Sequence, residues 1–144
     1  MSGVAILGVF VADTAYRAAR MPRLGETILG SGFALGPGGK GSNQAVAAAR
    51  LGADVTFISK IGQDPFGDMA MEIWAEAGVK TSVQRMAESY TGAASIFLED
   101  GSGDNAIIVC PGAAGTISVA DIEAAGDVIR GASGFITQLE QPLP

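Results

Sequence analysis

The sequence predicts an α/β fold with a mostly parallel sheet, and three observations support this prediction. Residues 4–9 and 55–59 are continuous apolar runs, which are typical of strands buried on both faces of a parallel sheet. Segments with helical patterns alternate with these runs, at about 42–51 and after residue 67. With 48% hydrophobic residues, the 144-residue chain has enough apolar side chains for the core of one domain.

Glycine and proline repeatedly interrupt the chain between the first strand and the first helix. Residues 17–37 contain β-capable pieces at 26–29 and 32–35, which predict a glycine-punctuated hairpin rather than a helix. Asp13 comes just after the first strand, and ligands of open α/β sheets collect at the carboxyl ends of strands. Asp13 is therefore a candidate site residue, and a loop acid or a cap fits the same position.

Both helices of the first half are predicted to end at a glycine. The first runs over about 42–51 with Gly52 after it, and its small residues suit close packing against a sheet. The second follows a turn at 62–67, contains Trp74 as a predicted core residue and is closed by Gly78. Strands and helices in this alternation predict right-handed βαβ units.

The next part of the chain departs from this alternation. Short β candidates lie at 81–85, 93–98 and 106–109, and a polar turn joins the last two. Antiparallel hairpins are therefore predicted as an insertion into the α/β chain.

The last part of the chain predicts one more helix and one more strand. Ser118 and Asp121 form a capping pair that opens a helix continuing to about residue 129. Residues 134–139 follow as a buried-type strand, and Glu140 lies at its C-terminal end. A parallel sheet that stopped there would keep an open edge, so we expect further chain beyond it, and no domain boundary is predicted within the sequence.

Composition excludes several classes of function. The net charge of -6 and the absence of any run of Lys or Arg argue against a nucleic-acid partner. The chain has no histidine, which excludes Ser-His-Asp hydrolysis, Cys-His nucleophiles and His-ligated zinc. The single cysteine, Cys110, leaves no internal disulfide or Cys-x-x-Cys metal site, and we expect it in the core. The apolar residues 4–12 are too short to span a membrane and follow no basic segment, so we expect a cytoplasmic protein.

The segment 36–52 is where we expect the chemistry of the protein. Four glycines lie within residues 36–41, directly before a helix, and let a ligand approach the main chain. Lys40 and Asn43 add side-chain donors, and the free amides of a helix start favour oxygen-rich ligands.

Two common phosphate-binding motifs fit this segment poorly. Gly36, Gly38 and Gly41 satisfy the spacing of the dinucleotide fingerprint, but the next strand ends at Ser59-Lys60 and not at the acid that would bind a ribose. A Walker A loop is excluded because the serine after the lysine is displaced by one residue.

A different pattern extends over the whole chain. Its segments are Ala12-Asp13, Pro22–Thr27, Gly38–Ala45, Arg50–Ala53, Ile61–Gly67, Thr91-Gly92, Pro111–Ala113 and Gln138–Glu140. In this order they resemble the ribokinase-like (PfkB) carbohydrate kinases, and within that family the ribokinases are nearest. Matching signals along the whole chain are more specific than a single glycine motif.

The resemblance implies a fold and a partner. The fold is a three-layer αβα arrangement with a small β-sheet lid, in which residues 1–144 are the N-terminal part of one kinase domain and 14–37 and 91–110 are the lid segments. The lid is expected to close over the sugar, which excludes water, and to form the contact of a homodimer.

The resemblance also implies which residues bind the sugar. They are Asp13, Gly38, Gly39, Lys40, Asn43 and Glu140. Their chemistry suits a polyol, because carboxylates accept hydrogen bonds from neighbouring hydroxyls, Lys40 and Asn43 donate, and glycines leave room.

One departure from the family pattern concerns the choice of sugar. Ribokinases usually have an asparagine two residues before the first acid, and this chain has Val11 there. D-ribose, converted to ribose 5-phosphate, is the first expectation, and another pentose, a hexose, a nucleoside or a keto-sugar acid stays open.

A second departure concerns the motifs that follow in the family. The Mg²⁺ motif, the nucleotide pocket and the segment with the catalytic Asp do not occur in these 144 residues. The resemblance therefore implies that ATP and Mg²⁺, with possible activation by a monovalent cation, act in a longer protein, and that this fragment has no catalytic residue and is inactive alone. The alternative is a non-catalytic sugar-binding or lid-mediated dimerisation module.

Overall fold

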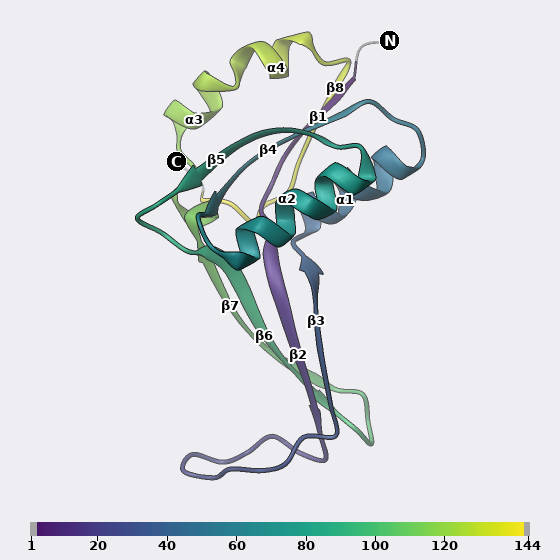
Figure 1. The fold of residues 1–144 in the computed structure, drawn as a ribbon, viewed down its shortest axis with the longest axis vertical. Coiled ribbons are helices and arrows are strands. Elements are labelled where there is room, and N and C mark those ends of the chain that lie inside the picture. Colours follow the sequence, from purple (N-terminus) through teal and green to yellow (C-terminus); the bar gives the residue numbers. More distant parts are fainter. Residues whose placement is uncertain (1–2, 143–144) are drawn as a thin grey trace.

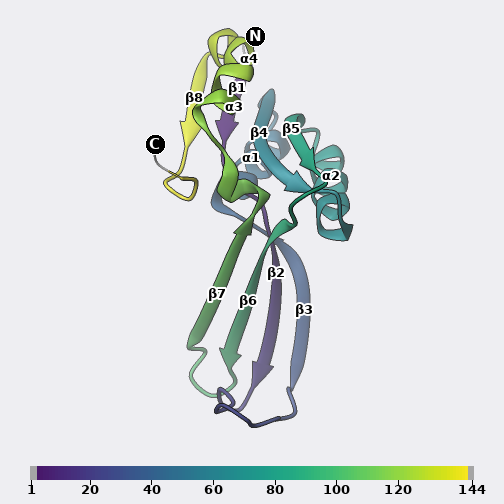
Figure 2. The ribbon, with the colours of Figure 1, turned by 90° about the vertical axis from the view of Figure 1, so that its left-hand side faces the viewer.

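The structure, a computed structural model, describes residues 3–142 and contains two sheets (Figure 1 and Figure 2). The first sheet is parallel throughout and has the order β5-β4-β1-β8, formed by Lys80–Met86, Val55–Gly62, Val4–Leu7 and Gly134–Thr137. Its central strands β1 and β4 are the two continuous apolar runs of the sequence. The predicted parallel sheet is confirmed.

Helices cover both faces of this parallel sheet. The helices α1 (Lys40–Arg50) and α2 (Pro65–Ala77) lie on one face, while the 3-10 turn η1 (Ala113–Thr116) and the short helices α3 (Val119–Ala124) and α4 (Gly126–Gly131) lie on the other (Figure 2). Gly52 and Gly78 follow the first two helices with φ of 91° and 77°, the left-handed conformation that glycine adopts most easily. The three-layer αβα arrangement is confirmed.

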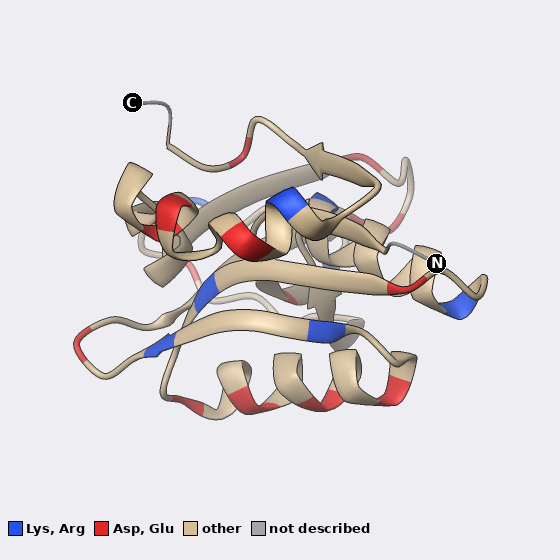
Figure 3. Ribbon diagram, turned by 90° about the horizontal axis from the view of Figure 1, so that it is seen from above, with Lys and Arg blue, Asp and Glu red and all other residues tan. Residues whose placement is uncertain are grey.

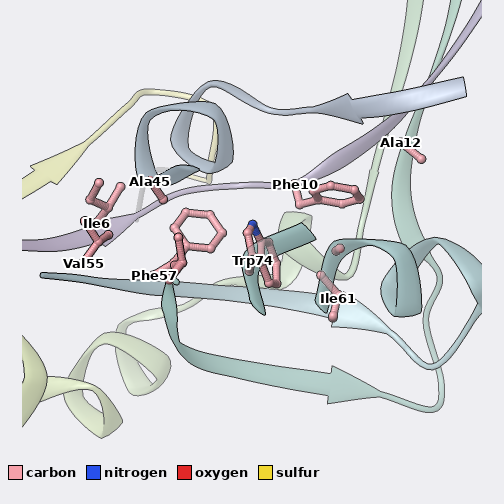
Figure 4. Close-up of a cluster of buried hydrophobic side chains, with 10 residues drawn as sticks. Ile6, Phe10, Ala12, Ala45, Val55, Phe57, Ile61 and Trp74 are labelled. Carbon is pink, nitrogen blue, oxygen red and sulfur yellow. The ribbon is translucent and has the colours of Figure 1, made fainter. Parts of the chain in front are cut away.

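The larger hydrophobic core lies between the parallel sheet and the α1–α2 layer (Figure 4). Trp74 is fully buried there, and its ring lies 5.7 Å from that of Phe10 and 5.0 Å from that of Phe57. The indole N–H donates a 2.9 Å hydrogen bond to Ser42 Oγ, so the polar atom of the ring is satisfied inside the core. Trp74 thereby joins α2 to α1, and its prediction as a core residue is confirmed.

The second sheet has the order β3-β2-β6-β7, formed by Gly32–Gly38, Val11–Ala18, Thr91–Glu99 and Asn105–Gly112. We call it the distal sheet, because it extends away from the helices (Figure 1). Strands β2 and β6 run parallel, and the two outer pairs are antiparallel. Only residues 8–10 separate β1 from β2, so one extended segment passes from the parallel sheet into the distal sheet.

Several local predictions were wrong, and each has a physical reason. Residues 26–29 form no strand, because β3 pairs with β2 along its whole length and leaves that segment without a partner. Strand β2 was not predicted, since its mixture of small and polar residues has little alternation. Cys110 is exposed, because β7 is an edge strand outside the core. The predicted single helix ending near residue 129 is broken in two at Ala125, directly before Gly126, a residue of low helix propensity.

An ion pair fixes α3 to the parallel sheet. Lys60 Nζ of β4 lies 2.7 Å from Asp121 Oδ2, and both side chains are largely buried. Burial raises the pKa of Asp121, but hydrogen bonds from Lys60, Ser118 and Gln84 outweigh it and hold that pKa at about 2. Asp121 is also half of the predicted capping pair, which is confirmed as a capping box with Ser118.

Charge is distributed unevenly over the helices. Acidic residues follow one another along α2, while Lys and Arg are scattered over several elements (Figure 3). Within residues 3–142, no helix is long and apolar enough to cross a membrane.

Candidate functional site

Gly38 and Gly39 connect the distal sheet to α1, and neither position has room for a side chain. A Cβ at Gly38 would overlap the carboxylate of Asp13. A Cβ at Gly39 would overlap the carbonyl group of Val9, and the φ of Gly39 is 90°. Sheet and helix approach each other closely only because both residues are glycine.

Asp13 projects from β2 with no hydrogen-bond donor among the described residues. The sequence predicted Asp13 just after the end of the first strand. In the structure β1 ends at Leu7, and Asp13 lies within β2, where it pairs with Gly36 of the distal sheet. Burial raises the pKa of its carboxyl group. A half-buried carboxylate without a partner is costly, so this group is an acceptor available to a ligand.

Glu140 and Lys40 form the second part of the site. Glu140 Oε2 accepts a 2.9 Å hydrogen bond from the backbone N–H of Lys40, and Glu140 Oε1 lies 2.8 Å from Lys40 Nζ. Glu140 follows β8 by three residues and so places its carboxylate at the N-terminus of α1, where the helix dipole favours negative charge. Two residues 100 positions apart, both of which the resemblance assigns to the sugar site, are therefore brought together.

Asn43 lies one turn further along α1 and is exposed. Its backbone N–H donates a 2.9 Å hydrogen bond to the carbonyl of Gly39, which closes the first helical turn. With Pro37 and Ile73 it borders a cavity of about 280 Å³. Of the predicted residues, Gly38 lies against the carboxylate of Asp13 and Lys40 binds that of Glu140, whereas Gly39 and Asn43 make no such contact among the described residues.

A pair of glutamines without a role predicted from the sequence supports this site. Gln138 Nε2 donates a hydrogen bond to Gln44 Oε1 and so ties the end of β8 to α1. Gln138 Oε1 is buried beside Gly8 and Gly41 with no donor among the described residues. Both glutamines lie within the segments that resemble the kinase family, and this position is the feature of the sequence that could have indicated their role.

The surface of the distal sheet around Asp13 is apolar. Asp13 lies beside Ala94 of β6, and Ala94 lies beside Val109 of β7. Val11, two residues before Asp13, is on the same face of β2 because side chains alternate along a strand. These small apolar residues follow no clear alternation in the sequence, so this apolar surface could not be predicted from it.

The arrangement combines acceptors, donors and open backbone within one small region. Asp13 and Glu140 supply carboxylate oxygens, Lys40 and Asn43 supply donors, and the two glycines leave space between them. Such a set suits a ligand with several hydroxyl groups. No group of three or more acidic or cysteine side chains in residues 3–142 converges to hold a metal ion, so none is assigned to Mg²⁺.

Comparisons with known proteins agree with this chemistry. The family model "pfkB family carbohydrate kinase" matches residues 1–140. The chain is 36% identical to a ribokinase of Mus musculus over 140 residues, which cover 96% of this chain and 43% of the mouse protein. It is 34% identical to a deoxyribokinase of Salmonella typhi over 141 residues, which cover 97% of this chain and 46% of that protein.

Solved structures agree as well. The structure of Arabidopsis thaliana ribokinase complexed with ribose and ATP matches with a TM-score of 0.85 and 30% identity, covering 98% of this chain and 46% of that one. The chain thus spans less than half the length of these relatives. A family match over nearly all of its residues shows that the chain belongs to the pfkB family of carbohydrate kinases.

Proposed function

We propose that this chain is the sugar-binding part and lid of an ATP-dependent carbohydrate kinase that phosphorylates a pentose, with D-ribose as the first candidate. The observation that carries the proposal is the carboxylate of Asp13, which is half-buried beside the glycine link to α1 and has no hydrogen-bond donor within residues 3–142. The Arabidopsis relative, solved with ribose and ATP, supports the choice of ligands.

Each residue of the site has a role in this proposal. Asp13 accepts hydrogen bonds from two neighbouring hydroxyls, and Asn43 donates to a third group of the sugar. Lys40 Nζ lies 2.8 Å from Glu140 Oε1. A sugar hydroxyl that enters between these two atoms replaces their ion pair by two hydrogen bonds, one to each side chain. Gly38 and Gly39 keep the path to these groups free of side chains.

Nucleotide and metal are assigned to residues outside this chain. The relatives are about twice as long, and the 144 residues lack the motifs by which the family binds Mg²⁺ and provides the catalytic Asp. ATP, Mg²⁺ and any activating monovalent cation therefore act in the longer protein, where Mg²⁺ neutralises charge on the transferred phosphoryl group.

A kinase assay tests this proposal directly. A protein extended through the downstream reading frame to the length of the relatives is expected to consume ATP only when D-ribose or another pentose and Mg²⁺ are present. Residues 1–144 alone are expected to show no turnover. Turnover by the short chain would refute its inactivity, and an extended protein that never requires a sugar would refute the kinase.

We further propose that the distal sheet, with segments 14–37 and 91–110, is the lid and mediates a homodimer. Tyr16 and Phe33 are 48% and 62% exposed on the face opposite Asp13, with their rings 5.2 Å apart. The exposed rings on this face favour association. Sedimentation is expected to give a dimer for the wild type and a monomer for Phe33→Ser, while Leu51→Ser, a change of another exposed apolar residue directly after α1, leaves the dimer intact. A wild-type monomer at high concentration contradicts this proposal.

A further inference from the structure

We infer that this sugar site makes no hydrogen bond to one hydroxyl of ribose, and that it binds 2-deoxy-D-ribose at least as tightly as D-ribose. The inference rests on the proposed function and concerns the wall of the site next to Asp13. It depends on one residue, Val11, and on what surrounds it.

Val11 lies directly beside the proposed acceptor. It pairs with Gly38 across β2 and β3, and the carboxylate of Asp13 lies against that same glycine. Val11 and Asp13 also share one face of β2, because they lie two positions apart along the strand. The methyl groups of Val11 are therefore next to the carboxylate that is expected to hold the sugar.

Val11 is fixed in this place. It is 8% exposed, and its Cγ1 lies close to Gly92 of β6. The next residues on this face, Ala94 of β6 and Gly36 of β3, carry no polar side-chain atom. The neighbours of Asp13 on this face thus offer a sugar no polar side-chain group, and the carboxylate of Asp13 itself is the one polar group there.

An apolar wall changes which pentose is favoured. A ribose hydroxyl turned toward Val11 loses its hydrogen bonds to water and finds no partner in the protein, which costs affinity. A methylene group in the same place contacts the methyl groups of Val11 favourably. The probe 2-deoxy-D-ribose differs from ribose by one hydroxyl and keeps the primary hydroxyl as a phosphoryl acceptor.

Calorimetry of the 144-residue chain with the two sugars tests the inference. The wild type is expected to bind 2-deoxy-D-ribose at least as tightly as D-ribose. Val11→Thr keeps the shape of the side chain and adds a hydroxyl, so it is expected to shift the ratio of the two affinities toward D-ribose by about tenfold. Val83→Thr makes the same chemical change on the core side of β5 and is expected to leave the ratio unchanged.

The outcomes separate this inference from the proposed function. D-ribose bound more than about tenfold tighter than 2-deoxy-D-ribose by the wild type overturns the inference alone. An unchanged ratio in a folded Val11→Thr variant also overturns it, because Val11 would then not face the sugar. Failure of the wild type to bind either sugar counts against the proposed function and against the inference with it.

Discussion

Gly39→Ala is expected to lower the free energy of unfolding by about 3 kcal/mol or more. Two costs combine at this position. An alanine has to adopt a φ of 90°, which L-residues rarely do. Its Cβ would also overlap the carbonyl group of Val9, so the link between the distal sheet and α1 has to shift. Urea denaturation of the variant and the wild type measures the difference.

A matched control separates strain from overlap. Gly52 has nearly the same φ, 91°, but nothing lies within 4 Å of the place where its Cβ would be. Gly52→Ala is therefore expected to cost only about 1 kcal/mol. Equal losses in the two variants would show that overlap with Val9 contributes nothing and that the close approach of sheet and helix is not what requires Gly39.

Asp13→Asn is expected to weaken sugar binding about a hundredfold, because hydrogen bonds to a charged acceptor are the strong ones. The amide keeps the size of the side chain and replaces one acceptor oxygen by a donor. Calorimetry with D-ribose and 2-deoxy-D-ribose measures the loss, which is expected to be similar for both. Asp127→Asn, a change at a carboxylate that is 99% exposed on α4, is the control and leaves both affinities unchanged.

The pH dependence of the same carboxylate gives a second measurement. Burial raises the pKa of Asp13, so its charge is lost at a higher pH than for an ordinary aspartate. Sugar affinity is expected to fall as pH falls from 7 toward about 4, and the fall is absent in Asp13→Asn. For stability the sign is opposite. Because the folded-state pKa is raised, the favourable contribution is present at low pH and is lost as pH rises through that pKa.

It follows that Asp13→Asn is expected to raise the thermal midpoint of the sugar-free protein at neutral pH while it weakens binding. A charge kept without a partner costs stability that a ligand restores. A variant that loses both affinity and stability would assign Asp13 a structural role in the distal sheet instead.

The sequence by itself determined the parallel sheet, the helices α1 and α2, and the order of the motifs. Buried strands and glycine-terminated helices depend on residues that are close in the sequence, so the local pattern of apolar residues and glycines predicts them directly. The neighbourhood of Lys40 and Glu140 was also foreseen, because the resemblance to the kinase family assigns both residues to the sugar site. The position of Cys110 was not foreseen, because an apolar run on an exposed edge strand has the same pattern as a buried one.

Only the tertiary structure decided how the distal sheet is built and what surrounds Asp13. Strand β2 has little alternation of its own and exists because β3 and β6 supply its hydrogen-bond partners from distant parts of the chain. Those same pairings place Gly38 against the Asp13 carboxylate and Val11 beside it. Pairing between strands is a long-range interaction, and a linear pattern of residues does not record which strand a small or polar segment will choose.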